Sequence, residues 1–313
     1  YKGIVKEIKK EIYSGFGIAK KLQLPEPLSG GLKSFIIWLY NNKGVNLTTM
    51  NIVVCVKQVP GTTEVKMNKE TNTIIREGVE AIINPFDTYA VEEALRIREK
   101  KGGKVTALSM GIPSVAELLK GTIALGVDEA ILLSDRAFAG ADTLATSYTL
   151  SMGIKKIGDV DLIICGKQAT DGDTAQVGPS LAEKLGYPHT TYVRKIEEIK
   201  EGYVRCQRMT EDGYEVIEMP LPAVITVVKE INEPRLPSIK GMMKAKKAVI
   251  EVWSSDDIGA DKDRCGLKGS PTQVVKTFVP VHDIQSEMIE GEATEQAGKL
   301  ADKLMEMQFP VCG

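Results

Sequence analysis

Five short, almost wholly apolar segments constrain the fold of this chain more than any other feature of its sequence. They are Ile52 to Val56, Val105 to Ser109, Ala130 to Leu133, Asp161 to Cys165 and Ala223 to Val228. Segments of this length that are rich in β-branched residues and lack polar alternation are typical of strands buried on both faces of a parallel sheet. We therefore expect five such strands in one sheet.

Helical patterns separate these segments. They cover Tyr89 to Lys101, Ser114 to Leu125, Thr143 to Ile157 and a stretch that ends near Leu185. Asp142 is a suitable N-cap for the third pattern, and Gly102 and Gly186 are suitable C-terminal stops. Strands that alternate with crossover helices predict an α/β fold with a right-handed, doubly wound and mostly parallel sheet.

Two later segments depart from this alternation. Residues Tyr203 to Met219 contain two alternating runs joined by Thr210-Glu211-Asp212-Gly213, which predicts a β-hairpin insertion. Residues Ala293 to Gln308 predict an amphipathic helix in a C-terminal arm, because four apolar residues fall on one stripe. These residues are Ala297, Leu300, Leu304 and Met307.

The first 49 residues differ from the rest and predict a Lys-rich helix followed by a linker. Met50 stands directly before the first strand, while the chain begins with Tyr1. We therefore expect residues 1–49 to be an extension outside the fold, either a functional arm or an artefact of a misplaced start.

Composition excludes several classes of function. The 313 residues are 43% hydrophobic, which is enough for one main domain, and 40 basic residues against 42 acidic ones give no general attraction to nucleic acid or to an anionic membrane. The early apolar run Phe35 to Tyr40 is too short to span a membrane. Five scattered cysteines and two histidines lack the spacing of disulfide frameworks, metal sites or Ser/His/Asp catalysis, so we expect a cytoplasmic protein without these.

The segments that follow the strands are the expected ligand sites, because open α/β sheets bind ligands beyond the carboxyl ends of their strands. The first strand leads into Lys57-Gln58-Val59-Pro60-Gly61, which Pro60 keeps from entering a helix directly. The segment Asn84-Pro85-Phe86-Asp87 predicts a turn that leads into a helix at about Thr88. The fourth strand is followed by the long loop from Gly166 to Pro179.

This long loop contains the parts of a phosphate cradle. Its glycines let backbone amides approach a ligand, Thr174 and Gln176 add polar side chains, and a helix begins close behind it. Asp171 and Asp173 repel phosphate unless they cap backbone amides. The loop matches neither GxGxxG nor the P-loop consensus. Turn glycines with helix-capping aspartates, or a magnesium site at Asp171 and Asp173, are the alternatives.

A second unusual segment runs from Glu233 to Lys247. Its prolines argue against regular structure, and Ile239, Met242 and Met243 are apolar residues among lysines in an expected loop. Exposed apolar patches with methionines and surrounding charge suit protein docking. The alternative is a solvated lysine run whose methionines pack on the parent sheet.

The chain from about Met50 to Gln308 resembles the β (small) subunit of the electron transfer flavoproteins. Four blocks carry the resemblance, namely Val56 to Pro60, Asn84 to Asp87 with Val91 to Ala94, Gly166 to Pro179, and Asn232 to Arg235 leading to Met243 to Lys247. The resemblance implies an adenine nucleotide alpha hydrolase-like, Rossmann-like fold and a heterodimer with a larger α subunit.

The resemblance also implies which residues bind ligands and partners. The implied cofactor contacts are Cys55, Asn84, Pro85, Phe86, Asp87, Met110, Gly166, Lys167, Gln168, Ala169, Thr170, Asp171, Gly172, Asp173, Thr174, Ala175, Gln176 and Val177. The implied partner contacts are Ile239, Met242, Lys244 and Lys247 in a recognition loop, with Ile239 as the anchor. The resulting domains are the extension at 1–49, a nucleotide-binding domain at 50–232, the recognition loop at 233–250 and a C-terminal arm at 251–313 whose helix packs on the α subunit.

Members of this family differ in the nucleotide that the β subunit holds. The respiratory type keeps AMP, whereas the electron-bifurcating type binds FAD that accepts electrons from NADH and passes them to the α-subunit flavin, a dehydrogenase and ferredoxin. Three segments resemble the bifurcating type: Lys57 to Pro60, Asp142 to Ser147 and Asp171 to Pro179. The resemblance thus implies FAD, an NADH-dependent oxidoreductase complex, and an acyl-CoA dehydrogenase or another flavin dehydrogenase as partner.

Two other interpretations compete with an electron carrier that uses FAD. One is a respiratory-type subunit with structural AMP. The other is a nucleotide-binding regulatory module of the universal stress protein type, without electron transfer. No side chain of the chain is an obvious redox carrier, so we expect any electrons to travel on a bound flavin.

Overall fold

The computed structural model describes residues 49–61, 67–68, 73–74, 80–275 and 286–307. Residues 1–48 of the predicted extension lie outside this described part. The chain divides into two compact units, one formed by Tyr1–Glu64 with Arg76–Gln273 and the other by Val65–Ile75 with Val274–Gly313. Across the described ranges, no helix combines the length and the apolar character needed to cross a bilayer.

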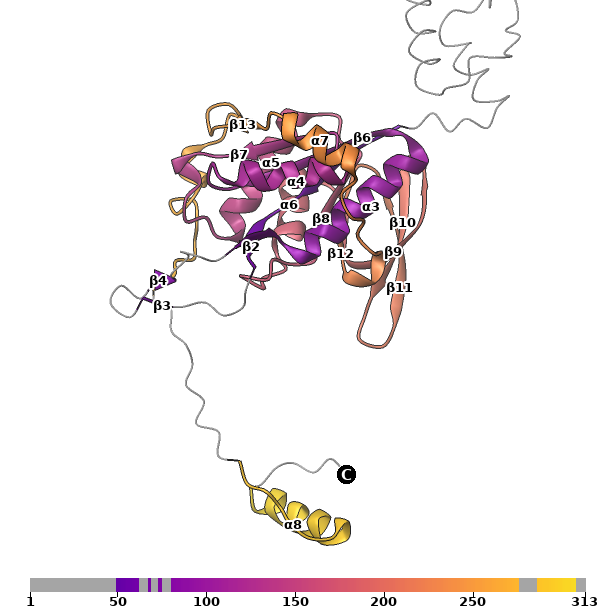
Figure 1. Ribbon diagram of the computed structural model, residues 1–313, viewed down its shortest axis with the longest axis vertical. Coiled ribbons are helices and arrows are strands. Elements are labelled where there is room, and N and C mark those ends of the chain that lie inside the picture. Colours follow the sequence, from indigo (N-terminus) through magenta and orange to yellow (C-terminus); the bar gives the residue numbers. More distant parts are fainter. Residues whose placement is uncertain (1–48, 62–66, 69–72, 75–79, 276–285, 308–313) are drawn as a thin grey trace, which may run out of the picture. The chain divides into compact units, whose positions relative to one another are not determined.

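The first unit is built on a nine-stranded sheet with the order β11-β10-β9-β12-β8-β1-β6-β7-β13 (Figure 1). The strands are β1 (Met50–Cys55), β6 (Gly103–Met110), β7 (Glu129–Leu133), β8 (Leu162–Gly166), β9 (His189–Lys200), β10 (Tyr203–Met209), β11 (Tyr214–Pro220), β12 (Ala223–Val227) and β13 (Glu251–Trp253). Pairing is parallel from β9 to β13 and antiparallel only between β9, β10 and β11. The predicted mostly parallel α/β sheet is confirmed.

The path of the chain creates a topological switch point between β1 and β8. The chain passes from β1 to its neighbours β6 and β7 on one side, then crosses to β8 and later to β12 on the other. Loops that leave β1 and β8 therefore turn in opposite directions, which opens a crevice at their carboxyl ends.

Helices cover both faces of this sheet. They are α3 (Pro85–Lys101), α4 (Val115–Leu125), α5 (Thr143–Ile157), α6 (Val177–Leu185) and α7 (Ile239–Lys247). One apolar core joins α3, α4 and α7 to side chains such as Ile52 and Ile164, and a second joins α5 and α6 to side chains such as Val53 and Ile163. Alternate residues of each central strand thus enter opposite cores, as expected for a doubly wound sheet.

Short elements complete the description. Strands β2 (Gln58–Pro60) and β5 (Ala81–Ile83) pair antiparallel in the first unit, and three 3₁₀ turns lie at η1 (Arg136–Phe138), η2 (Lys229–Ile231) and η3 (Lys262–Arg264). The second unit contains the paired strands β3 (Met67–Asn68) and β4 (Thr73–Ile74) and the helix α8 (Ala293–Glu306). The predicted C-terminal amphipathic helix is confirmed, and its Leu300 and Leu304 side chains are solvent-exposed.

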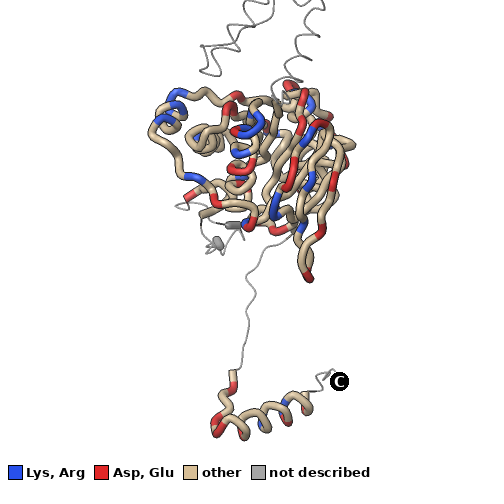
Figure 2. Tube along the Cα trace, turned by 90° about the vertical axis from the view of Figure 1, so that its right-hand side faces the viewer, with Lys and Arg blue, Asp and Glu red and all other residues tan. Residues whose placement is uncertain are grey.

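The predicted segments match these elements closely. The five apolar segments correspond to β1, β6, β7, β8 and β12. The predicted hairpin turn joins β10 to β11, and Met209 and Tyr214 pair directly before and after it. Asp142 caps α5, because its carboxylate accepts hydrogen bonds from the amides of Leu144 and Ala145. Figure 2 shows acidic and basic residues interspersed on the hairpin strands, where Arg205 pairs with Glu218 across β10 and β11.

Three features differ from the sequence-based expectations. The first helix begins at Pro85 and not near Thr88, because proline suits the first helical position. The twelve-residue strand β9 was not expected, since charged residues interrupt its apolar pattern. The segment 233–250 contains the helix α7 where a loop was expected, because both prolines precede the helix and the Ser238 hydroxyl accepts a hydrogen bond from the Gly241 amide.

Candidate functional site

Predicted cofactor residues lie at the carboxyl edge of the central strands. Cys55 ends β1, Met110 ends β6 and Gly166 ends β8, and these three strands are neighbours in the sheet. The amino end of α3 supplies Asn84 as its N-cap, followed by Pro85, Phe86 and Asp87. Residues that are far apart in the sequence thus meet at the switch point.

Asp87 bridges the two strands that flank the switch point. Its carboxylate accepts hydrogen bonds from the backbone amide of Lys57 at 2.7 Å, just after β1, and from the amide of Gly166 at the end of β8. Burial raises the pKa of Asp87 to about 7, although hydrogen bonds from Lys57, Asn84 and Gly166 act to lower it. The carboxyl group therefore titrates near neutral pH in the folded protein.

The close approach of Asp87 explains why residue 166 is a glycine. A Cβ atom on Gly166 would lie 2.3 Å from the Asp87 Oδ1 atom and 2.7 Å from the Phe86 carbonyl carbon. The Asp87 side chain is buried and the Phe86 carbonyl carbon belongs to the backbone of α3, so neither can move away easily. The glycine allows the end of β8 to pass directly beneath α3.

Asn84 fastens the long loop to the amino end of α3. Its Nδ2 group donates to the Gln168 carbonyl at 2.8 Å, and its Oδ1 atom accepts from the Thr170 amide at 3.1 Å. The backbone amide of Asn84 donates to the Lys57 carbonyl at 2.9 Å. One buried side chain thus holds the beginning of the loop against the segment that follows β1.

The two aspartates of the loop have different partners from those considered in the sequence. Asp171 forms an ion pair with Lys57, with the Nζ atom 2.6 and 2.9 Å from the two carboxylate oxygens. Asp173 accepts a hydrogen bond from the Gln168 side chain at 2.6 Å. The helix-capping alternative is wrong, because Gln176 is the N-cap residue of α6. Across the described ranges, no group of three or more acidic, histidine or cysteine side chains gathers as a metal site would require.

The backbone of this loop is strained at two positions. Asp173 has φ of 49° and Ala175 has φ of 54°, in the left-handed region that side chains disfavour. Residues 170–174 and Gln176 are exposed to solvent. Among the described residues, the amides of Thr174, Ala175 and Gln176 take part in no hydrogen bond within the protein. Left-handed residues with free amides next to a helix terminus form concave anion-binding surfaces, so the loop fits a phosphate group.

A lysine and two aromatic rings lie at the same edge. The Lys167 Nζ atom is 5.6 Å from the centre of the Phe86 ring and 5.2 Å from that of Tyr192. Tyr192 has φ of 58°, which is unusual for a bulky residue, and its amide donates to the Thr226 hydroxyl. Lys167 therefore adds positive charge close to the exposed loop, whereas the charge of Lys57 is paired with Asp171.

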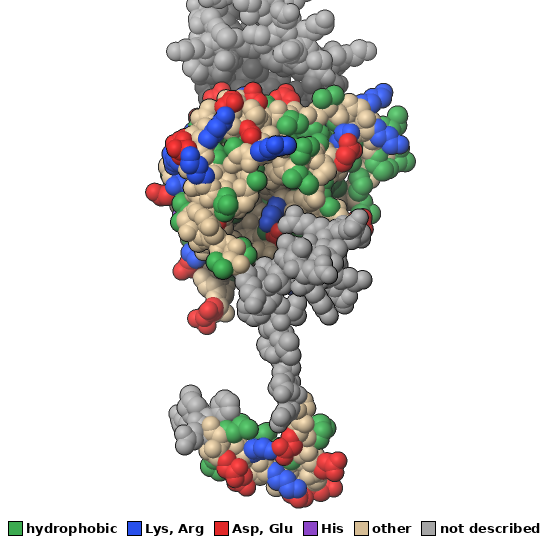
Figure 3. Space-filling model, turned by 90° about the vertical axis from the view of Figure 1, so that its left-hand side faces the viewer, with side chains coloured by type: hydrophobic (Ala, Val, Ile, Leu, Met, Phe, Trp, Pro, Cys, Tyr) green, Lys and Arg blue, Asp and Glu red, His purple; other side chains and the backbone are tan. Residues whose placement is uncertain are grey.

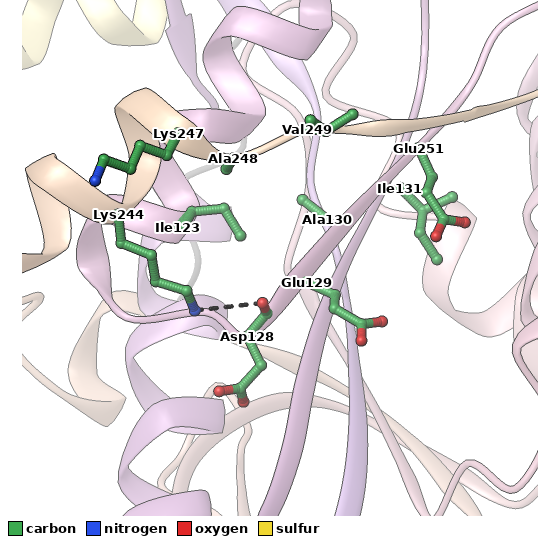
Figure 4. Close-up of a pocket in the computed structure, with 10 residues that line it drawn as sticks. All are labelled: Ile123, Asp128, Glu129, Ala130, Ile131, Lys244, Lys247, Ala248, Val249 and Glu251. Atoms are coloured by element: carbon green, nitrogen blue, oxygen red, sulfur yellow. Dashed lines mark hydrogen bonds between the residues drawn. The ribbon is translucent and has the colours of Figure 1, made fainter.

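The predicted partner residues lie elsewhere, on α7. Ile239 is 76% exposed, and Met242 and Met243 are also exposed on this helix. Lys244 and Lys247 instead line a pocket of about 350 Å³ together with residues of the β7 amino end, including Asp128 and Glu129 (Figure 4). The Lys244 ammonium donates to the Val127 and Asp128 carbonyls at 3.2 and 3.3 Å. Figure 3, which views the molecule from another side, shows apolar and basic side chains close together on the surface.

Comparison with known proteins identifies the family. Residues 71–258 match the electron transfer flavoprotein domain. The chain is 52% identical over 257 residues to the electron transfer flavoprotein subunit beta of Thermoanaerobacterium thermosaccharolyticum, which covers 82% of this chain and 98% of that protein. The chain belongs to the electron transfer flavoprotein β-subunit family.

Two further relatives broaden the comparison. The caffeyl-CoA reductase-Etf complex subunit CarD of Acetobacterium woodii is 51% identical over 259 residues, covering 82% of this chain and 98% of that subunit. Protein FixA of Azorhizobium caulinodans is 41% identical over 267 residues, covering 83% and 95% of the two chains. Membership of this β-subunit family implies an α-subunit partner.

Two residues of the site, Lys57 and Tyr192, were not among the predicted cofactor contacts. Lys57 belongs to the Val56 to Pro60 block, and its position directly after β1 was the available signal. Its pairing with Asp171 joins residues 114 positions apart, which no local pattern reveals. Tyr192 gave no signal, because its left-handed backbone and its approach to Lys167 exist only in the folded chain.

Proposed function

We propose that this electron transfer flavoprotein β subunit holds FAD beyond the carboxyl ends of β1 and β8. In this proposal the subunit accepts electrons from NADH and passes them to the α-subunit flavin and a dehydrogenase, with ferredoxin as the second acceptor. The observation that carries the proposal is the strained loop with free amides at Thr174, Ala175 and Gln176, which Asn84 fastens to the switch point. The similarity of this chain to CarD, a subunit of a caffeyl-CoA reductase-Etf complex, supports a role in an oxidoreductase assembly.

The residues of the chain would bind and orient the nucleotide. The amides of residues 174–176 would donate to phosphate oxygens, since they donate to no described group of the protein. Lys57 neutralises Asp171 and thereby reduces the repulsion between that carboxylate and a phosphate. Lys167 would supply a positive charge at the side of Phe86. The bound flavin supplies the redox chemistry, and the protein determines its position and electrostatic surroundings.

AMP would use the same phosphate contacts, because the loop amides recognise phosphate and not a particular nucleotide. Nucleotide analysis of the purified αβ complex distinguishes the two ligands. A second FAD per heterodimer supports the proposal, whereas AMP with a single FAD supports a respiratory-type carrier. A complex without flavin that still binds an adenine nucleotide would refute electron transfer and favour a regulatory module.

The role of the loop is tested by the double variant Asp173→Ala with Thr174→Ala. We expect the purified complex to retain less nucleotide, because the Gln168 to Asp173 hydrogen bond that shapes the loop is lost together with a hydroxyl donor. The matched control is Glu211→Ala with Asp212→Ala at the exposed hairpin turn. Equal nucleotide retention in the two double variants, with unchanged unfolding curves, would contradict the assignment.

We further propose that α7 is the surface that docks a flavin dehydrogenase, such as an acyl-CoA dehydrogenase. An exposed isoleucine and two exposed methionines stand among lysines on this helix, which is the composition of an adaptable docking surface. Ile239→Asp is expected to weaken reduction of the dehydrogenase by the complex, while NADH oxidation with an artificial acceptor stays unchanged. A parallel loss of both rates would indicate a different role for α7.

A further inference from the structure

The segment from Asn232 to Ser238 connects η2 to α7 without regular structure of its own. Its first half lies along α3. The Asn232 side chain donates to the Tyr89 carbonyl and to the Glu93 carboxylate, each at 3.0 Å. Arg96 donates to the Glu233 carbonyl at 3.1 Å. These contacts hold the segment on the helix whose amino end forms the candidate nucleotide site.

Arg235 makes the most extensive contacts of this segment. Its guanidinium donates to the Glu92 carboxylate from Nε at 2.7 Å and from Nη2 at 3.2 Å. It also donates to Glu99, two turns of α3 further on, from Nη1 at 2.5 Å and from Nη2 at 3.2 Å. The Arg235 amide adds a bond to Glu92 at 3.2 Å. The planar guanidinium is therefore fixed against two carboxylates of one helix, a geometry that a lysine cannot reproduce.

The burial of the Glu92 carboxylate distinguishes this ion cluster from a solvent-exposed ion pair on the surface. Its side chain is only 5% exposed, and it also accepts a hydrogen bond from the Arg96 Nε atom at 2.6 Å. Burial raises the pKa of Glu92, but the hydrogen bonds from Arg235 and Arg96 outweigh it, so that the pKa lies below its usual range. A charged, buried carboxylate requires its partners, since leaving it unpaired is costly.

Only three residues separate Arg235 from the first residue of α7. The helix then packs closely on α4, where a Cβ atom on Gly241 would lie 2.0 Å from the Ala124 carbonyl oxygen. The exposed Ile239 stands in the first turn of α7, near the end that is connected to Arg235. A shift of Arg235 along α3 would therefore be transmitted directly to the start of α7 and to Ile239.

We propose that Arg235, held by Glu92 and Glu99, is a positioning residue that presents α7 to the partner dehydrogenase. This inference rests on the proposed docking role of α7. Arg235 itself faces α3, so it acts on the partner through the position of Ile239 and its neighbours. Docking through α7 thus depends on an ion cluster whose carboxylates belong to a different helix.

The test uses the αβ complex with Arg235→Ala, Arg235→Lys and a matched control, Arg205→Ala. Arg205 also forms an ion pair with a glutamate, at 2.7 Å from Glu218, but it lies on the hairpin and has no connection to α7. The probe is a purified acyl-CoA dehydrogenase that the unsubstituted complex reduces with NADH as the electron donor. Initial rates are measured against the concentration of the αβ complex, and hydrogen exchange of the α7 amides is followed in parallel.

We expect Arg235→Ala to raise the KM for the complex about tenfold, which corresponds to about 1.4 kcal/mol, while kcat and nucleotide content stay unchanged. The α7 amides should exchange faster in this variant. Arg235→Lys should give an intermediate KM, because it keeps the charge but not the forked geometry. Arg205→Ala should match the unsubstituted complex in every measurement.

Three results with Arg235→Ala would overturn the inference. The first is an unchanged KM in Arg235→Ala. The second is a raised KM without faster exchange in α7, since Arg235 would then contact the partner itself. The third is a joint loss of kcat and nucleotide, which would indicate general destabilisation. The Ile239→Asp variant separates the two proposals. If it raises KM and Arg235→Ala does not, only the positioning role fails, whereas an unchanged KM in Ile239→Asp refutes the docking role and the inference together.

Discussion

The substitution Gly166→Ala tests the geometry of the switch point most directly. The added Cβ atom would lie 2.3 Å from the Asp87 Oδ1 atom, 2.7 Å from the Phe86 carbonyl carbon and 2.8 Å from the Phe86 Cβ atom. Contacts this short require the amino end of α3 to move away from the end of β8. We therefore expect the substitution to disturb both the fold and the proposed nucleotide site.

The expected cost has two parts. Forcing an extra methyl group into a packed interior costs about 1–3 kcal/mol. Displacing Asp87 also weakens its hydrogen bond from the Gly166 amide, and a buried group without its partner costs about 1–3 kcal/mol. The free energy of unfolding should therefore fall by about 2–6 kcal/mol, taking these two terms as additive.

Urea denaturation of the αβ complex measures this loss, and the nucleotide content of the purified complex gives an independent readout. The matched control is Gly172→Ala in the same loop, where no atom lies within 4 Å of the added Cβ and φ is not in the left-handed region. Gly172→Ala should leave the free energy of unfolding unchanged. If the two alanine variants unfold at the same urea concentration, the close approach of β8 and α3 is not as described and the reasoning is refuted.

Three further predictions follow from other parts of the structure. The pKa of Asp87 is raised from 3.8 to about 7, so between these pH values the folded state holds a proton that the unfolded state has lost. The free energy of unfolding should therefore fall as pH rises from about 4 to about 7. Asp87→Asn should remove this pH-dependent contribution, on the order of 4 kcal/mol, from denaturation curves measured across that range. Lys57→Ala should change the free energy of unfolding by less than about 1 kcal/mol, because its ion pair is exposed, yet it should weaken nucleotide retention measured after dialysis because Asp171 is then uncompensated. Gly241→Ala should loosen α7 from α4, since its Cβ atom would lie 2.0 Å from the Ala124 carbonyl oxygen, and should speed tryptic cleavage after the lysines of α7; unchanged cleavage would contradict that packing.

Local patterns were sufficient to predict most of the fold. The buried strands β1, β6, β7, β8 and β12 follow from continuous apolar runs, because residues that face two helical layers must be apolar on both sides. The ends of α5 and α6 follow from the cap chemistry of Asp142 and Gly186. The expectation that Asn84 to Asp87 and Gly166 lie together follows from one general rule, that parallel strands present their carboxyl ends at the same edge.

Local patterns failed where neighbouring structure decides the conformation. The strand β9 was missed because charged residues interrupt its apolar pattern, and its Tyr192 adopts a left-handed conformation beside the register shift between β9 and β12. The helix α7 forms after two prolines because Ser238 caps it and Gly241 lets it approach α4. Propensity alone cannot supply either contact, since the partner groups belong to distant parts of the chain.

The sequence by itself determined the α/β class, the central strands and the set of loops that meet at their carboxyl edge. Hydrophobic periodicity and helix capping depend only on residues that are close together in the sequence. Only the tertiary structure decided which charged side chains pair with one another. Lys57 pairs with Asp171, and Arg235 with Glu92, across 114 and 143 residues of chain. The raised pKa of Asp87 has the same origin. Burial and ion pairing depend on distances that exist only once the sheet and its helices have come together.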